Sequence, residues 1–264
     1  MQVRTPAVAG MFYPGEPHHL EQLLERFILG AETGGVRDPY AIVAPHAGYI
    51  YSGAVAGTAY ATLPADFDGT FVVVGPSHGG YPTCASAVPW ETPLGIVDVD
   101  ADLVAALGLP TNESYMRDEH SLEVQMPFVK YRCPRARVAP VMMGLQDLGS
   151  AAALGDRIDR AARETGREVR VIASSDFSHY VPDRLARSQD LYAIEALEDL
   201  EIERFYQRIA ERRITACGYG PISAACMAAE AWGAKHARLL QYATSGDATG
   251  DRSSVVGYAA LAVI

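Results

Sequence analysis

The sequence lacks any cluster of lysine or arginine. Its 264 residues include 22 Lys and Arg against 32 Asp and Glu, which gives a formal net charge of −10. A nucleic-acid-binding surface needs basic side chains that follow a phosphate backbone and release its counterions. The charge pattern therefore argues against a nucleic-acid partner.

Cysteine is also scarce, and no two cysteines form a CxxC pair. The four are Cys84, Cys133, Cys217 and Cys226. Small secreted domains that depend on disulfides carry many more cysteines at closer spacing. The pattern predicts free thiols in a reducing compartment, and we expect the cytoplasm.

No apolar run is long enough to cross a membrane. The longest, VVGYAALAVI, has ten residues, whereas a membrane-spanning helix needs about 20. The N-terminus, MQVRTPAVAGMFYPG, has no continuous apolar core of a signal peptide. The glycine-rich loops do not read GxGxxG or GxxxxGK[ST] behind a strand. The sequence therefore predicts no membrane segment, no export signal and no nucleotide-binding loop.

What the sequence does contain is a regular alternation of short β-branched runs with segments of helical period. This alternation is typical of βαβ units around a parallel sheet. The predicted strands are 40–45, 70–76, 137–143, 168–175, 237–243 and 254–263, and the predicted helices are 17–29, 53–62, 100–107, 119–131, 147–165, 183–212 with a break, and 221–232. We predict one α/β domain over residues 1–264, with a mostly parallel or mixed central sheet flanked by helices.

One predicted helix carries a histidine off its apolar face. In DEHSLEVQMPFVKYRC the apolar side chains recur at helical spacing, and His120 lies on the opposite face. Asp118 is expected to cap this helix, and Pro127 to kink or divide it.

Polar side chains gather where the apolar strands end. The segments VAPHAG, VVGPSHGG and VIASSDFSHY place His46, Ser77, His78, Asp176 and His179 just beyond three strands. In open α/β sheets, ligands bind outside the carboxyl ends of the strands. The pattern indicates a site at that edge of the sheet.

His46 and His78 follow the two strands of one βαβ unit, so they should lie on the same side of the sheet. If these strands are neighbours, both imidazoles can bind one metal ion. Cys217 precedes a glycine-rich turn and a predicted helix, whose N-terminus favours the thiolate form. The alternatives are histidines that only hydrogen-bond a loop, and a cysteine that is a small buried apolar residue.

His120 and His179 each adjoin carboxylates in the sequence, with Asp176 close to His179. Such pairs suit a general acid or base, or a group that orients a metal ligand. Either histidine can instead be a hydrogen-bonded loop residue. The tail SGDATGDRSSVVGYAA lacks the full EF-hand pattern, and we interpret it as a turn at the rim of a pocket.

Seven segments together resemble the Memo family, whose prokaryotic members are labelled AmmeMemoRadiSam system protein B. The segments are AGMFYPG, APHAGYIYSG, GPSHGG, DEHSLEVQMPF, SSDFSHY, ACGYGPI and SGDATGDRSSVVGYAA, in order over nearly the whole chain. The family's fold is similar to that of the class III extradiol-type non-haem iron dioxygenases. The resemblance therefore implies an α/β architecture with a metal pocket.

The resemblance implies one iron or copper ion held by His46, His78 and Cys217, with His120 and His179 nearby. Cys217 stands where the dioxygenases supply a carboxylate, which argues against ring cleavage and towards copper or another redox role. Animal members carry a histidine at the position that Gln125 occupies here. Prokaryotic members resemble proteins that act with a radical-SAM protein and an AMMECR-type protein. The resemblance implies that together they modify a small molecule or a protein.

Three functions remain open at this point. The first is a dioxygenase-like, metal-dependent oxidoreductase in which His179, His120 and Asp176 handle protons. The second is a hydrolase or transferase with Cys217 as nucleophile, His179 or His46 as base, and Asp176 as the group that orients this base. The third is a non-catalytic module that binds a peptide or protein in the same pocket. The predicted pocket residues are Tyr49, Tyr51, Ser77, Asp118, Tyr180 and Tyr219.

Overall fold

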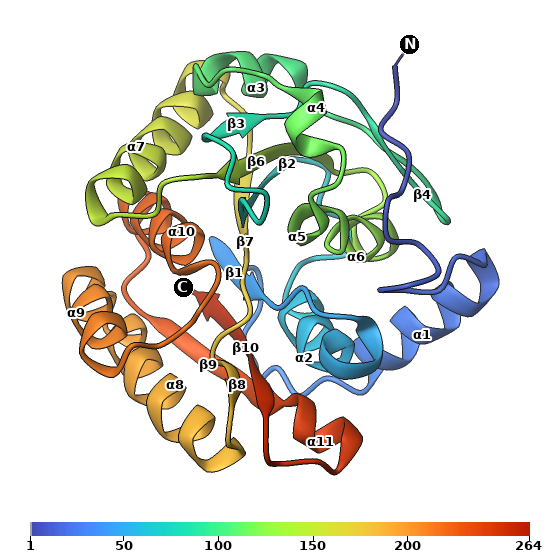
Figure 1. Ribbon diagram of the computed structural model, residues 1–264. Helices are drawn as coiled ribbons and strands as arrows, with labels where there is room; N and C mark the ends of the chain where they lie inside the picture. The colour runs from blue at the N-terminus through green and yellow to red at the C-terminus, as the bar shows by residue number, and fades with distance from the viewer. Residues whose placement is uncertain (1) are drawn as a thin grey trace.

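A mixed β-sheet crosses the middle of the molecule, with helices packed on both of its faces (Figure 1). The computed structural model describes residues 2–264. The strands are β1 (Ala41–Ala44), β2 (Thr70–Pro76), β3 (Cys84–Ala85), β4 (Trp90–Thr92), β5 (Gly95–Val97), β6 (Arg137–Met143), β7 (Val169–Ser174), β8 (His179–Val181), β9 (Ala237–Thr244) and β10 (Val255–Val263). The helices are α1 (Pro17–Leu29), α2 (Tyr49–Ala61), α3 (Ala101–Leu107), α4 (Glu113–Met116), α5 (His120–Glu123), α6 (Met126–Arg132), α7 (Leu148–Thr165), α8 (Asp183–Glu198), α9 (Ile202–Arg212), α10 (Tyr219–Ala231) and α11 (Ser245–Thr249).

The strand order in the main sheet is β3-β6-β2-β7-β1-β10-β8, and β9 pairs with β10. Strands β6, β2, β7 and β1 run parallel to their neighbours. Strands β3, β10, β8 and β9 pair antiparallel and complete the edges. The prediction of an α/β fold with a mixed central sheet flanked by helices is confirmed.

Both faces of the parallel strands are buried, because helices cover each face. In β1, Ala41 and Val43 pack with α7 and α10, whereas Ile42 and Ala44 pack with α1 and α2. A strand covered on both sides reads as a continuous apolar run rather than an alternating one. All six predicted strands are present in the structure, and this burial explains the four parallel ones, β1, β2, β6 and β7.

Two predicted helices are divided. The segment 183–212 breaks between α8 and α9, where Leu200 has a left-handed φ of 56°. The segment 119–131 divides into α5 and α6, and Pro127 lies in the first turn of α6, where its missing N–H is tolerated. The cap expected at Asp118 is wrong, because the carboxylate of Glu119 accepts the hydrogen bond from the Ser121 N–H.

The sheet order shows that the strands before His46 and His78 are not neighbours, so the condition set for a shared metal ion by adjacent strands is not met. β7 lies between β1 and β2, so the two strands do not touch. Any site that contains both histidines must therefore be built by the loops that extend over the end of β7.

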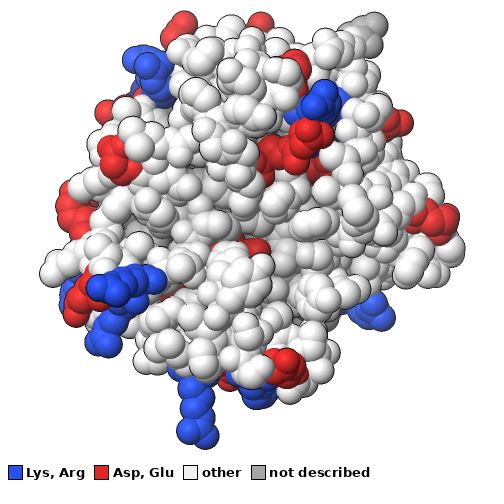
Figure 2. All heavy atoms as spheres, in the orientation of Figure 1, with Lys and Arg blue, Asp and Glu red and all other residues white. Residues whose placement is uncertain are grey.

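The charged side chains are dispersed over the surface. Figure 2 shows acidic and basic residues scattered over one face of the molecule, without a broad basic patch on that face. Among the helices of residues 2–264, none combines the length and apolar character needed to cross a bilayer.

Candidate metal centre

A cleft of about 650 Å³ opens at the carboxyl ends of β1, β2 and β7. Its lining comes from the N-terminal segment, the loops after these strands, the start of α2 and α5, and the segment 245–256. The cleft therefore lies where the sequence predicted a site, at the edge of the sheet where the parallel strands end.

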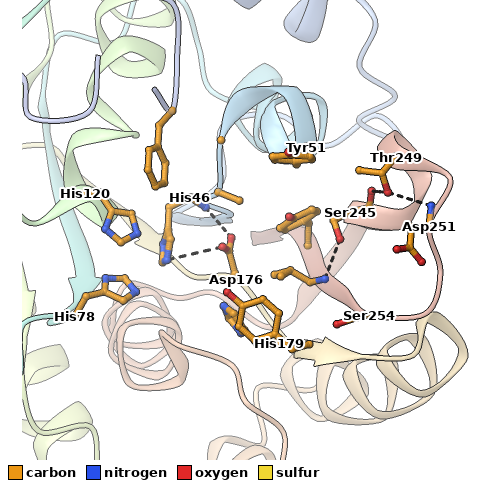
Figure 3. Close-up of a pocket in the computed structure, with 16 residues that line it drawn as sticks. His46, Tyr51, His78, His120, Asp176, His179, Ser245, Thr249, Asp251 and Ser254 are labelled. Atoms are coloured by element: carbon orange, nitrogen blue, oxygen red, sulfur yellow. Dashed lines mark hydrogen bonds and ion pairs between the residues drawn. The ribbon is translucent and has the colours of Figure 1, made fainter. Parts of the chain in front are cut away.

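Three histidines from three different elements meet in this cleft. His46 follows β1, His78 follows β2, and His120 begins α5. One ring nitrogen of each lies within 4.8 Å of the other two. Figure 3 shows the three rings turned toward one another, with His78 and His120 stacked at a centroid distance of 4.3 Å. Three imidazoles at this separation can bind one metal ion.

A chain of hydrogen bonds fixes the orientation of His46. The Ser174 hydroxyl donates to the Ser121 carbonyl (2.7 Å) and accepts from the Gln125 amide (2.9 Å). The proton of the Ser174 hydroxyl is therefore already donated to Ser121. The 2.9 Å contact between this hydroxyl and His46 Nδ1 must then be a hydrogen bond that His46 donates. His46 Nε2 is then left unprotonated, as a metal requires.

Glu119 performs the same task for His78. Its carboxylate accepts from both the backbone N–H and Nδ1 of His78, each at 2.8 Å. Burial raises the pKa of Glu119, but the hydrogen bonds from His78 and Ser121 outweigh it and lower that pKa to about 2. An ionised carboxylate can only accept, so His78 carries its proton on Nδ1 and presents Nε2 for binding.

His120 is held by packing. Its ring lies 4.9 Å from the ring of Phe12, and among the described residues no hydrogen bond reaches it. Burial and the neighbouring His78 lower the pKa of His120, and burial lowers that of His46 still further. Both imidazoles therefore favour the neutral form, which is the form that binds a metal.

Cys217 lies beside the three-histidine group but outside it. Its Sγ is 3.2 Å from His46 Nε2 and accepts a hydrogen bond from the Asp176 N–H at 3.3 Å. The expectation that a helix N-terminus lowers the pKa of this thiol is wrong. α10 begins two residues later, at Tyr219, and burial together with the Asp176 carboxylate raises the pKa of Cys217.

Asp176 faces His46 rather than His179. Its Oδ1 accepts from the His46 N–H (2.8 Å), and its Oδ2 lies 4.0 Å from His46 Nε2. Burial raises the pKa of the Asp176 carboxyl to about 6. His179 is oriented instead by the Thr215 carbonyl, to which its Nδ1 donates over 2.9 Å. The expectation that Asp176 orients His179 is therefore wrong, and His179 Nε2 is the free nitrogen of a residue that lines the cleft.

Comparisons with known proteins place this chain in a family. A family model described as Memo-like protein matches residues 4–262. The chain belongs to the Memo family. It is 44% identical to a MEMO1 family protein of Methanosarcina barkeri over 99% of this chain and 100% of the relative. It is 43% identical to one of Archaeoglobus fulgidus over 98% of each chain, and 37% identical to one of Methanocaldococcus jannaschii over 99% of each.

Two of the six predicted pocket residues line the cleft in this Memo-family chain. They are Tyr51, 41% exposed, and Tyr180, 78% exposed. Two others are held elsewhere: Tyr49 is buried and donates to the Val124 carbonyl over 2.7 Å, while Asp118 is exposed and pairs with Arg117.

The remaining two predicted pocket residues also lie outside the lining. Ser77 holds a turn by accepting from the Tyr81 N–H at 2.8 Å. Tyr219 packs edge-on against Tyr206, with ring centroids 5.4 Å apart. Residues near a site in sequence thus need not face it.

Sequence reasoning missed several residues of the Memo-family site. The sequence places Glu119 next to His120 but does not indicate that it orients His78. The roles of Ser174 and Phe12 were not predicted either. Ser174 sits two residues before Asp176 in a polar strand end, a signal that was available. Phe12 carried no such signal, because only the path of the N-terminal segment brings it to His120.

Behind the cleft of this Memo-family chain, Asp190 is a buried carboxylate that hydrogen-bonds Ser178 and Tyr242. Burial raises its pKa to about 6, despite these hydrogen bonds. A carboxyl whose pKa is raised by folding stabilises the fold below the unfolded-state pKa of about 4 and loses that contribution as pH rises through about 6.

The Asp190→Asn variant has no such carboxyl and keeps its stability as the pH rises. We therefore expect the free energy of unfolding of the variant, relative to that of the wild type, to rise by about 2 kcal/mol from pH 4 to pH 7. Urea unfolding across this pH range measures the difference. Asp199→Asn, a change at an exposed carboxylate, is the control and should show a constant difference. Parallel pH profiles for the wild type and Asp190→Asn would contradict the expectation.

Proposed function

We propose that this protein binds one iron or copper ion in the cleft and acts as a redox protein. The observation that supports this proposal is the three-histidine group, whose nitrogens lie within 4.8 Å of one another. The tautomers of two of these histidines, His46 and His78, leave Nε2 free. In metal sites, the other ring nitrogen of a histidine ligand typically donates to an oxygen acceptor, which orients the imidazole.

The proposed donors are the imidazoles of His46, His78 and His120, together with the thiolate of Cys217. Cys217 Sγ is 3.2 Å from His46 Nε2, so an ion held by that nitrogen lies within reach of the sulfur. Imidazole suits copper, iron and zinc, whereas thiolate favours the softer copper ion and some forms of iron. A bound cation would favour the thiolate form of Cys217, although burial alone favours the thiol.

The protein side chains supply binding and proton transfer. When bound, the metal would supply one-electron chemistry and polarise an oxygen-containing substrate. His179, with Nε2 free, is the proposed base that accepts a proton from the substrate, and Asp176 is the proposed proton donor beside His46. His120 is the third imidazole of the site.

We propose a small molecule or a peptide as the substrate. Prokaryotic Memo proteins resemble proteins that act together with radical-SAM and AMMECR-type partners. This resemblance supports the proposal that such partners supply or consume the substrate. The free cysteines support a reducing compartment, which we propose to be the cytoplasm.

Anaerobic titration of the metal-free protein with Fe(II), and with Cu(I), tests the proposal. We expect one equivalent of iron or copper to bind per chain, and oxygen uptake to depend on the loaded metal. Absence of binding by either ion, or binding that a surface histidine variant such as His236→Ala removes, would overturn it.

The contact between Cys217 and His46 also favours a second function, with Cys217 as a nucleophile activated by His46. The elevated pKa of Cys217 weighs against this reading. Mass spectrometry after iodoacetamide treatment separates the two functions. A nucleophile is alkylated rapidly in metal-free protein, whereas a metal ligand with a raised pKa reacts slowly.

A further inference from the structure

The cleft continues well beyond the histidines. Figure 3 shows His46, His78 and His120 at one end, and Thr249, Asp251 and Ser254 at the other. The second end is built by α11 and the loop that follows it, and the metal proposed above does not require these residues. They are therefore available to bind another part of a ligand.

The charged residues of the cleft all have one sign. Asp176 and Asp251 line it, and within the described part of the chain no lysine or arginine does. The two arginines that hold the α11 loop, Arg187 and Arg252, are each paired with Asp183 and Asp247 at distances between 2.6 and 3.1 Å. Their charges are thereby balanced, whereas within residues 2–264 no cationic side chain pairs with Asp251.

Within residues 2–264, only one of the two oxygens of the Asp251 carboxylate accepts hydrogen bonds. Its Oδ1 accepts hydrogen bonds from the N–H (2.9 Å) and hydroxyl (2.7 Å) of Ser253. Over residues 2–264, no hydrogen bond or ion pair reaches its Oδ2. An ionised carboxylate with a free oxygen at the end of a cleft is an acceptor for a cationic donor.

Four aromatic residues also line the cleft. They are Phe12, Tyr51, Tyr180 and Tyr258. Tyr180 has a left-handed φ of 58°, a conformation that costs energy in a residue other than glycine and is typical of functional positions. The faces of such rings attract ammonium and guanidinium groups.

We propose that the cleft binds a small organic cation whose protonated amine lies against Asp251 and the tyrosine rings. The proposal rests on the proposed function, since the other end of this ligand would face the metal site. A volume of about 650 Å³ is of the size that holds a small molecule. At the far end of the cleft, the ionised carboxylate of Asp251 repels anionic groups such as carboxylates and phosphates.

Three probes that share a phenol ring and differ in charge test the proposal. They are tyramine, p-cresol and 4-hydroxyphenylacetate, and calorimetry at low ionic strength measures their binding. We expect tyramine to bind about five-fold more tightly than p-cresol, and 4-hydroxyphenylacetate to bind most weakly. Equal binding of the three probes, preference for the acid, or no binding of any probe would overturn the proposal.

The Asp251→Asn variant keeps the acceptor oxygen for Ser253 but removes the charge. We expect it to reduce the preference for tyramine over p-cresol about three-fold. Asp118→Asn, at an exposed carboxylate outside the cleft, is the matched control and should leave the preference unchanged. An unchanged preference in Asp251→Asn would overturn the assignment of the amine to this end.

Measurements on both metal-free and metal-loaded protein separate the two proposals. A preference for tyramine in a protein that binds no iron or copper would overturn only the proposed function. Metal binding without any preference among the probes would overturn only the inference about the ligand.

Discussion

Metal binding is expected to fall about a thousand-fold when His46 is replaced by alanine. His46 is 2% exposed, and its Nε2 lies 3.2 Å from the sulfur of Cys217. Its orientation is set by the Ser174 hydroxyl and by the Asp176 carboxylate, which accepts from its backbone N–H. The variant loses a nitrogen donor that is already in place, so no other side chain can substitute for it.

Two further variants separate the roles of His120 and Cys217. We expect Cys217→Ser to retain an ion but to lose the sulfur-to-metal charge-transfer absorption of the copper form. His120→Ala should weaken binding by a smaller factor than His46→Ala, because its side chain is 25% exposed and no hydrogen bond among the described residues orients its ring. Metal analysis and absorption spectra of anaerobically purified proteins measure both effects.

His236→Ala is the control for these variants, because His236 is an exposed residue outside the cleft. Its metal content and spectrum should equal those of the wild type. An unchanged metal content in both His46→Ala and Cys217→Ser would disprove the ligand assignment. An unchanged spectrum in Cys217→Ser alone would remove the thiolate from the donor set.

The second large effect concerns stability. Glu123 is 1% exposed and accepts hydrogen bonds from Arg4 (2.7 Å), Tyr13 (2.8 Å) and the N–H groups of Ala7 and Val8. This one carboxylate therefore ties the N-terminal segment to α5. Glu123→Ala leaves the buried Arg4 charge without its carboxylate and the donors of Tyr13, Ala7 and Val8 without their acceptor. We expect it to lower the free energy of unfolding by about 3–5 kcal/mol.

Chemical denaturation of the purified variants measures this loss. Glu123→Gln keeps one acceptor oxygen and should lose less than Glu123→Ala. Glu201→Ala removes a surface pair with Arg204, whose side chains are 47% and 50% exposed, and should cost less than about 1 kcal/mol. Similar losses in Glu123→Ala and Glu201→Ala would show that the buried carboxylate does not anchor the N-terminal segment.

The same anchor connects the N-terminal segment to the site. Phe12 lies within the segment that Glu123 holds, and its ring contacts His120 at 4.9 Å. Arg4 also donates to the Glu119 carbonyl over 3.0 Å, next to the carboxylate that orients His78. Direct contacts therefore couple the stability of this segment to the positions of the histidines.

Much of the fold follows from local pattern. The buried strands are continuous apolar runs, and the division of 119–131 follows from Pro127. The short strands β3, β4, β5 and β8 escaped prediction, because two or three residues carry too little pattern. The pairing of β3 and β8 is set, in addition, by strands distant in the sequence. The starts of α2 and α10 also lie earlier than periodicity indicated, at Tyr49 and Tyr219.

The sequence by itself determined which residues stand at the ends of the buried strands, and therefore that His46, His78 and Asp176 lie at one edge of the sheet. Only the tertiary structure decided that β7 separates the two histidine-bearing strands, and that His120 rather than Cys217 completes the group of three. The reason is physical. Strand ends are specified by residues close in the chain, whereas the order of strands and the contacts of loops depend on how helices far apart in sequence pack against the sheet.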